Sequence, residues 1–181
     1  MAAITTTEER DEGGDLLLWV LVWGELAAFG ILLTGYVVMS MLHPESFALA
    51  RLHLAPRLAG LNTVVLLASS WLAALAAGSQ GKPRRQRLFL LGAACLGFLF
   101  VALKFAEYRS EWAATGDQNL QTFFELYFLI TGFHLAHVAF VGLLFVLAAI
   151  RLDRSVIVTL TTIWHVIDIV WLVMFPLIYL S

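Results

Sequence analysis

Five long apolar runs, almost free of charged residues, limit the possible folds of this 181-residue sequence more than any other feature. A bilayer core requires about 20 residues of α-helix, and unpaired backbone polar groups are too costly in hydrocarbon for other open structures. The alternating pattern of a membrane barrel is absent. The sequence therefore predicts an all-α, polytopic membrane protein, a bundle of five transmembrane helices. The predicted spans are residues 16–42, 58–78, 88–108, 120–150 and 156–180.

Turn and breaker residues separate these spans and predict four connections. They are residues 43–56, 81–83, 115–117 and 151–155. The last is so short that the fourth and fifth spans are expected to be antiparallel neighbours.

The composition agrees with a membrane environment and excludes several functions. Hydrophobic residues make up 61% of the chain and charged residues 13%, against about 45–50% and about 25% in soluble domains. A net charge of -2 gives no basic stripe, so no nucleic-acid partner is expected. The single cysteine, Cys95, excludes a disulfide framework and a thiolate zinc site.

The Lys and Arg residues predict the orientation of the chain. Seven of the eleven fall on the side of the N-terminus and three on the opposite side, and Lys104 lies within a span. Because cytoplasmic loops retain basic residues, we expect a cytoplasmic N-terminus and a C-terminus on the outer side. Residues 1–15 are acidic and polar, without the basic region and cleavage site of a signal peptide. We predict a cytoplasmic N-terminal tail over 1–15 and one transmembrane domain over 16–181.

Few ionisable residues lie inside the predicted spans, and they are costly to bury unless partnered. Those away from the ends of the spans are Glu25, His134, His137, His165 and Asp168. Counting 1.5 Å per residue places them in one band of depth. We expect a ring of Glu25, His134, His165 and Asp168 in the bundle interior, in which each carboxylate accepts a hydrogen bond from an imidazole.

Three roles for such a ring remain open from the residues alone. Interhelical hydrogen bonds of about 1 kcal/mol each would fix which helices meet. Carboxylates and imidazoles could instead relay protons. Haem ligation would need His134 and His165 as opposed axial ligands from neighbouring helices, because histidines three residues apart on one helix cannot both bind one iron axially.

A second charged pair, Lys104 and Glu107, stands three residues apart near the outer end of the third span. We expect a solvated helix end there, with the lysine extended toward water. The sequence has no P-loop, no HExxH motif and no Ser/His/Asp arrangement. No catalytic residues and no metal site are therefore expected in this chain.

Several segments, taken together and in order, resemble one family. Residues 124–138 read FELYFLITGFHLAHV, similar to a TGFHxxHV signature, and residues 164–171 read WHVIDIVW, similar to a WHxxDxVW helix. Residues 61–70, 105–108 and 23–25 add an NT…SS helix, an EY helix end and a WGE segment. The chain resembles subunit III of the haem-copper oxidases in its five-helix form. It is most similar to the NorE-type proteins associated with nitric oxide reductases.

The resemblance implies a non-redox accessory subunit of a haem-copper oxidase or nitric oxide reductase, multi-pass in the bacterial cytoplasmic (inner) membrane. Such a subunit stabilises the catalytic subunit and supports proton uptake in aerobic or denitrifying electron transport. It implies no cofactor in this chain, haem with copper or non-haem iron in the catalytic partner, and bound phospholipid. Carried over residue by residue, Glu25 would be the family's buried carboxylate, and Glu107 would close the outer end of the third helix. The inner polar network would consist of His134, His137, His165 and Asp168.

Two alternatives stay open at this point. One is a stand-alone membrane cytochrome b-type electron carrier that binds haem through His134 and His165. The other is a small ion or proton transporter that uses the predicted ring as its path. The lack of an internal repeat and of broken helices speaks against the transporter.

Overall fold

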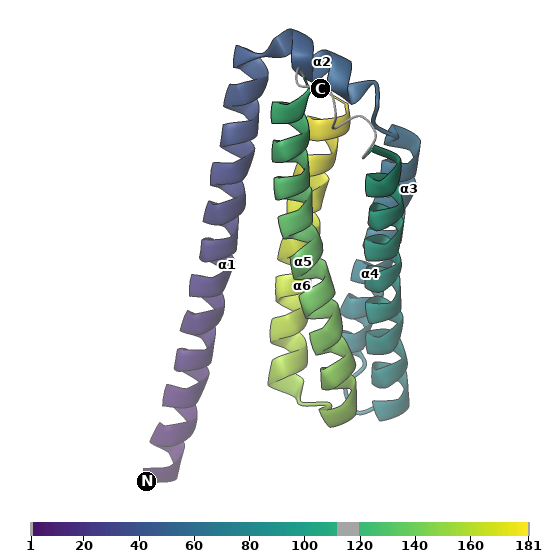
Figure 1. The fold of residues 1–181 in the computed structure, drawn as a ribbon. Helices are drawn as coiled ribbons and strands as arrows, with labels where there is room; N and C mark the ends of the chain where they lie inside the picture. Colours follow the sequence, from purple (N-terminus) through teal and green to yellow (C-terminus); the bar gives the residue numbers. More distant parts are fainter. Residues whose placement is uncertain (1, 112–119, 181) are drawn as a thin grey trace.

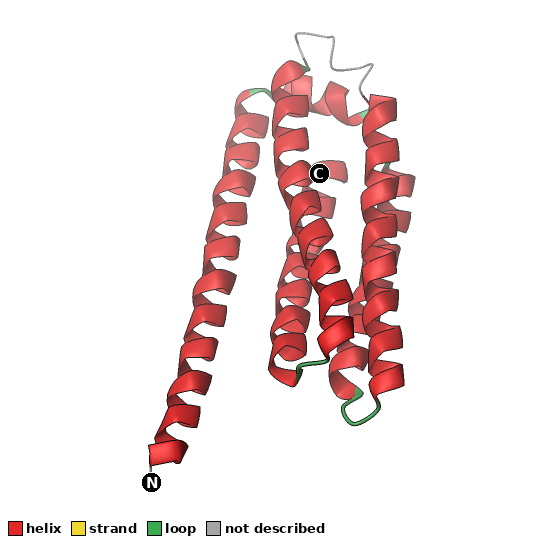
Figure 2. Ribbon diagram, turned by 60° about the horizontal axis from the view of Figure 1, so that its bottom comes forward, coloured by secondary structure: helices red, strands yellow, loops and turns green. Residues whose placement is uncertain are grey.

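The computed structural model describes residues 2–111 and 120–180, and within the first helix it describes side chains at Leu16 and from Trp19 onward. This part of the chain is helical, without a strand (Figures 1 and 2). Its helices are α1 (Ala2–Leu42), α2 (Pro44–Arg51), α3 (Pro56–Gly78), α4 (Pro83–Glu111), α5 (Gln121–Arg151) and α6 (Arg154–Tyr179).

Five of the described helices are long and apolar enough to cross a membrane, which confirms the predicted five-helix fold. The candidate span in α1 covers Trp19–Leu42, and α1 continues back through the predicted tail to Ala2. Helix α4 exceeds the predicted span at both ends, beginning at Pro83 and ending at Glu111. Proline suits a helix start because the first amides lack intrahelical acceptors. The connection predicted at 115–117 lies outside the described residues.

Helix α2 is an element that the sequence reasoning missed. Residues 43–56 were expected to form only a connection, but α2 occupies most of this stretch. Pro44 and the acidic Glu45 stand in its first turn, where both favour a helix. Phe47 is buried and packs edge-on against Phe123 of α5, with ring centroids 5.3 Å apart. Helix α2 therefore covers one end of the bundle between α1 and α3 (Figure 1).

Helices α3 to α6 form a tightly packed group of four. Buried alanines are frequent in α3 and α4, and small residues let two helix backbones approach closely. These buried alanines are Ala59, Ala73 and Ala76 of α3 and Ala93 and Ala94 of α4. Helix α6 returns beside α5 through a short connection, so the two are antiparallel neighbours as predicted (Figure 1).

Helix α1 stands apart from this group. It contacts α5 and α6, but it leans away from them toward its N-terminal end (Figure 1). Only 11% of its candidate span is buried inside the protein, against 44% for α5. Most side chains in this span of α1 therefore face the surroundings of the bundle.

Candidate functional site

Glu25 and His137 form the polar contact between α1 and α5. Nε2 of His137 lies 3.1 Å from Oε1 of Glu25, and both side chains are partly buried. Nδ1 of His137 lies 2.7 Å from the carbonyl oxygen of Phe133. Because a carbonyl oxygen only accepts, Nδ1 must carry a hydrogen. The contact with Glu25 then needs one further hydrogen, carried either by Nε2 or by the carboxyl group.

His165 makes a separate contact, to α3 rather than to α1 or α5. Its Nδ1 lies 2.6 Å from Oγ of Ser70. Asp168, one turn further along α6, is buried, and neither of its carboxylate oxygens has a hydrogen-bond partner among the described residues. This cluster joins α3 to α6.

His134 is fully buried among aromatic rings. The centroid of its imidazole ring lies 6.0 Å from the ring centroid of Phe29, 5.8 Å from that of Phe100 and 5.1 Å from that of Trp171. Neither ring nitrogen finds a hydrogen-bond partner in the described part of the chain. His134 contacts side chains of α1, α4 and α6 but lies outside both polar contacts.

The predicted ring of four residues is therefore wrong in its pairing. Positions three apart on a helix differ by about 60° in direction. His137 consequently reaches Glu25 on α1, while His134 turns toward α4 and α6. His165 faces Ser70 of α3, which the prediction did not include.

The expected solvated helix end at Lys104 and Glu107 is also wrong. The two side chains are 0% and 1% exposed, and Nζ lies 2.9 Å from Oε2 of Glu107. The ammonium also lies 4.8 Å from the ring centroid of Tyr127 and 5.0 Å from that of Tyr179, within range of cation–π attraction. Both side chains are therefore enclosed where α4, α5 and α6 meet. Helix α4 continues past them to Glu111.

The hydrogen bonds of this outer cluster have one consistent arrangement. The three N–H groups of Lys104 donate to Oε2 of Glu107, to the hydroxyl of Tyr127 at 2.7 Å and to the hydroxyl of Tyr179. Tyr179 then donates to Oε1 of Glu107 at 2.7 Å. Tyr127 donates to Oε1 of Glu111 at 3.1 Å.

Sequence reasoning missed Glu111, Tyr127 and Tyr179 as members of the cluster. The spacing of Glu111 from Glu107, four residues on the same helix, was the available signal. The tyrosines come from other helices, and only the packing brings them here.

Two further polar bonds join α3 to α6 and α3 to α4. Trp171 donates to Oγ1 of Thr63 at 2.9 Å, and Asn62 donates to the carbonyl of Phe100 at 3.2 Å. Within the described residues, no group of three or more His, Cys, Asp or Glu side chains is placed to hold a metal ion. These hydrogen bonds and the buried ion pair join the helices to one another.

Comparison with known proteins decides the family. Residues 52–181, which include α3 to α6, match the family described as cytochrome c oxidase subunit III. The chain belongs to the cytochrome c oxidase subunit III family. Subunit III relatives cover most of the chain at 24–30% identity. The resemblance to haem-copper oxidase subunit III is thereby confirmed.

Three relatives illustrate the range of subunit III proteins that the chain resembles. It is 24% identical to the cytochrome bo(3) ubiquinol oxidase subunit 3 of Buchnera aphidicola, over 91% of this chain and 92% of that protein. It is 30% identical to the cytochrome c oxidase subunit 3 of a Synechocystis species, over 86% and 70%. It is 26% identical to a probable quinol oxidase subunit 3 of Staphylococcus epidermidis, over 97% and 94%. These bacterial relatives include both cytochrome c and quinol oxidase subunits.

Proposed function

We propose that this chain is a non-redox accessory subunit of a respiratory terminal oxidase in a bacterial cytoplasmic membrane. It packs beside the catalytic subunit, which carries haem together with copper or non-haem iron, and it stabilises that subunit. The match to the subunit III family over residues 52–181 carries the proposal. The interhelical polar bonds support it, because they use buried polar groups to hold the bundle together. They include Ser70 with His165 and Lys104 with Glu107.

A nitric oxide reductase is the alternative catalytic partner. It rests on the resemblance to NorE-type proteins. The relatives reported above carry oxidase names, so the oxidase is the first choice.

A mild-detergent pull-down of the chain from its native membranes tests the assignment. We expect a colourless chain that brings with it a large haem-containing subunit, and mass spectrometry of that subunit distinguishes an oxidase from a nitric oxide reductase. A chain that comes alone with a Soret band would instead support a cytochrome b-type carrier. A colourless chain that comes alone and conducts ions in proteoliposomes would support a transporter.

The Glu25–His137 pair is proposed to support proton uptake by the complex. The hydrogen bonds of His137 to Phe133 and Glu25 leave one hydrogen that either partner can supply, which is what a proton-transferring pair requires.

Glu25→Gln separates the proton role from the structural one. The amide can donate to Nε2 of His137 and preserve the contact, but it cannot release a proton. We expect the variant complex to assemble with unchanged haem content and to turn over more slowly. Glu125→Gln, at an exposed position of α5, is the matched control and should behave as wild type. Unchanged turnover in both Glu25→Gln and Asp168→Asn would contradict a proton role for the buried carboxylates.

A further inference from the structure

One end of the bundle carries a group of basic residues. The α3–α4 connection and the α5–α6 connection both lie at this end (Figures 1 and 2). Exposed lysine and arginine residues come from these connections and from the helix ends beside them. They are Lys82, Arg84, Arg85, Arg87, Arg151 and Arg154, and we call them the basic end. None of them forms an ion pair with a side chain that the structure describes.

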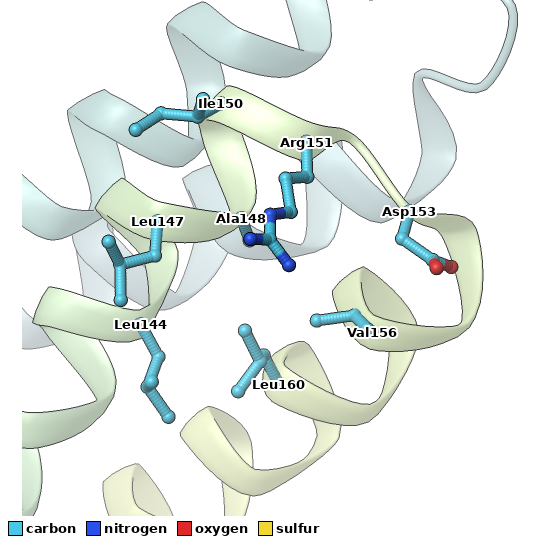
Figure 3. Close-up of a pocket in the computed structure, with 8 residues that line it drawn as sticks. All are labelled: Leu144, Leu147, Ala148, Ile150, Arg151, Asp153, Val156 and Leu160. Atoms are coloured by element: carbon cyan, nitrogen blue, oxygen red, sulfur yellow. The ribbon is translucent and has the colours of Figure 1, made fainter.

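Asp153, the acidic residue between Arg151 and Arg154, is engaged elsewhere. Its Oδ1 accepts from the backbone N–H of Ser155 at 3.1 Å and from the hydroxyl of Ser155 at 3.0 Å, which caps the start of α6. Leu152, in the left-handed region with φ 53°, closes the turn. Arg151 and Asp153 point in different directions from it (Figure 3). The basic end therefore keeps its positive charge.

Helix α1 brings the opposite charge to the same end of the molecule. Residues 8–12 read EERDE, with four acidic residues and one arginine, and we call them the acidic segment. The segment precedes the candidate span, which begins at Trp19. The N-terminal end of α1 lies at the same end of the molecule as the two connections (Figure 1). The acidic segment and the basic end are thus both outside the apolar spans and on one side of the membrane.

Gly13 and Gly14 join the acidic segment to the rest of α1. Glycine is unfavourable in a helix interior, because it loses more backbone freedom on folding than any other residue. In the structure α1 continues through both glycines as one helix, and its N-terminal end stands apart from the bundle (Figure 1). A bend at these two residues costs less than a bend elsewhere in α1.

The segment is long enough to reach the bundle after such a bend. Extended from Gly13, the chain brings Glu8 about 17 Å away, at about 3.4 Å per residue. A helix with its side chains is about 10 Å wide. The long helices that α1 contacts are α5 and α6, so Arg151 and Arg154 are the part of the basic end next to it.

Charge and tethering together select the occupant of the basic end. A segment on a short linker has an effective concentration in the millimolar range, which a free acidic peptide does not reach in most settings. The four acidic residues complement the exposed cations, and opposite charges in water attract over about 8 Å at physiological ionic strength.

We propose that the acidic segment of α1 docks on the basic end of its own chain, with α1 bent at Gly13 and Gly14 and the first contacts at Arg151 and Arg154. The contact holds the N-terminal part of α1 beside α5 and α6, at the end of the bundle opposite α2. Because exposed ion pairs are weak and screened by salt, the docking is reversible. It does not depend on the proposed function, because both surfaces belong to this chain.

Electron paramagnetic resonance distances between two spin labels test the proposal on the full chain. The labels are placed at Thr7→Cys and at Gln80→Cys, in the α3–α4 connection, after the exposed Cys95 has been changed to alanine. The chain is reconstituted in phosphatidylcholine nanodiscs, which carry no net lipid charge. We expect a short label distance at an ionic strength of about 0.01 M and its loss at about 1 M, where the Debye length falls from about 30 Å to about 3 Å.

Charge exchange identifies the two surfaces. Glu9→Lys with Glu12→Lys reverses the acidic segment, and Arg151→Glu with Arg154→Glu reverses the near part of the basic end. Each pair alone should remove at least half of the short-distance population, and the two pairs combined should restore it. Glu45→Lys and Arg57→Glu make the same kinds of change at exposed positions near the opposite end, and both should behave as wild type.

Three results would overturn the proposal. The first is a label distance that does not change with salt in the wild-type sequence, a measurement that needs no charge variant to fold. The second is a combined variant that is no closer to wild type than either pair alone. The third is loss of the short distance when the labelled chain is diluted with unlabelled chain, one copy per nanodisc, because the contact would then join two copies.

Discussion

Gly97 of α4 lies so close to Trp164 of α6 that a Cβ at Gly97 would come 2.6 Å from Cη2 of the indole. Trp164 is fully buried and packs on Phe145, with ring centroids 5.0 Å apart. The indole therefore has little room to retreat. The missing side chain at Gly97 leaves room for the indole of Trp164 against α4.

Gly97→Ala should accordingly destabilise the protein by about 1–3 kcal/mol, the usual cost of overpacking. Gly30→Ala is the matched control, because nothing lies within 4 Å of a Cβ there. Removing a helical glycine at an open position should stabilise by about 0.5–1 kcal/mol. Melting temperatures of the purified chain in detergent, followed by circular dichroism, measure both changes. A Gly97→Ala variant that melts like the wild type would show that the indole can move aside.

Lys104→Met should be among the most damaging single changes in the chain. It leaves the carboxylate of Glu107 buried without its cation, at a cost of about 3–5 kcal/mol. Adding Glu107→Leu to Lys104→Met should recover part of the loss, because the uncompensated charge is then gone. Thermal unfolding of the single and double variants measures the recovery. Arg109→Met, at an exposed position of α4, is the control, and an equal loss there would contradict the role of the buried pair.

The contact between Glu25 and His137 should hold α1 against α5. Glu25→Ala removes the hydrogen bond to Nε2 of His137, so distances between spin labels on α1 and α5 should lengthen. In Glu25→Gln the amide can donate to Nε2 and keep the contact, so an equal lengthening in that variant would point to another cause.

Ser70→Ala should weaken the contact between α3 and α6. The change removes the hydrogen bond to Nδ1 of His165, and interhelical hydrogen bonds in membranes contribute about 0.6–1.7 kcal/mol. Thr162→Ala is the control, because the hydroxyl of Thr162 bonds only within α6, to the carbonyl of Val158. The difference between the two melting temperatures is the quantity to measure. No difference would mean that water replaces the serine hydroxyl at no cost.

The five spans could be predicted because lipid imposes length and apolarity on every helix that crosses it. The antiparallel α5–α6 pair followed from the short link around Leu152. Helix α2 was missed because its eight residues are too short and too mixed for an apolar pattern to stand out. Pro44 begins this helix, but prolines are also common in loops, so it did not distinguish a helix from a connection.

The polar contacts were harder to predict, because they depend on how each helix is rotated about its axis. Depth along the helix placed Glu25 near both His134 and His137, but only the packing of α1 selects His137. The same limit applies to Lys104. Its partners Tyr127 and Tyr179 come from α5 and α6, and no spacing within α4 indicates them.

The position of α1 has a consequence for the order in which the protein is built. Helix α1 precedes α3 and α4 in the chain, yet the long helices that it contacts, α5 and α6, follow them. During translation α1 must therefore stay in lipid, tethered through α2, until α5 and α6 have been inserted. A newly made chain thus passes through a stage in which Glu25 has not yet met His137.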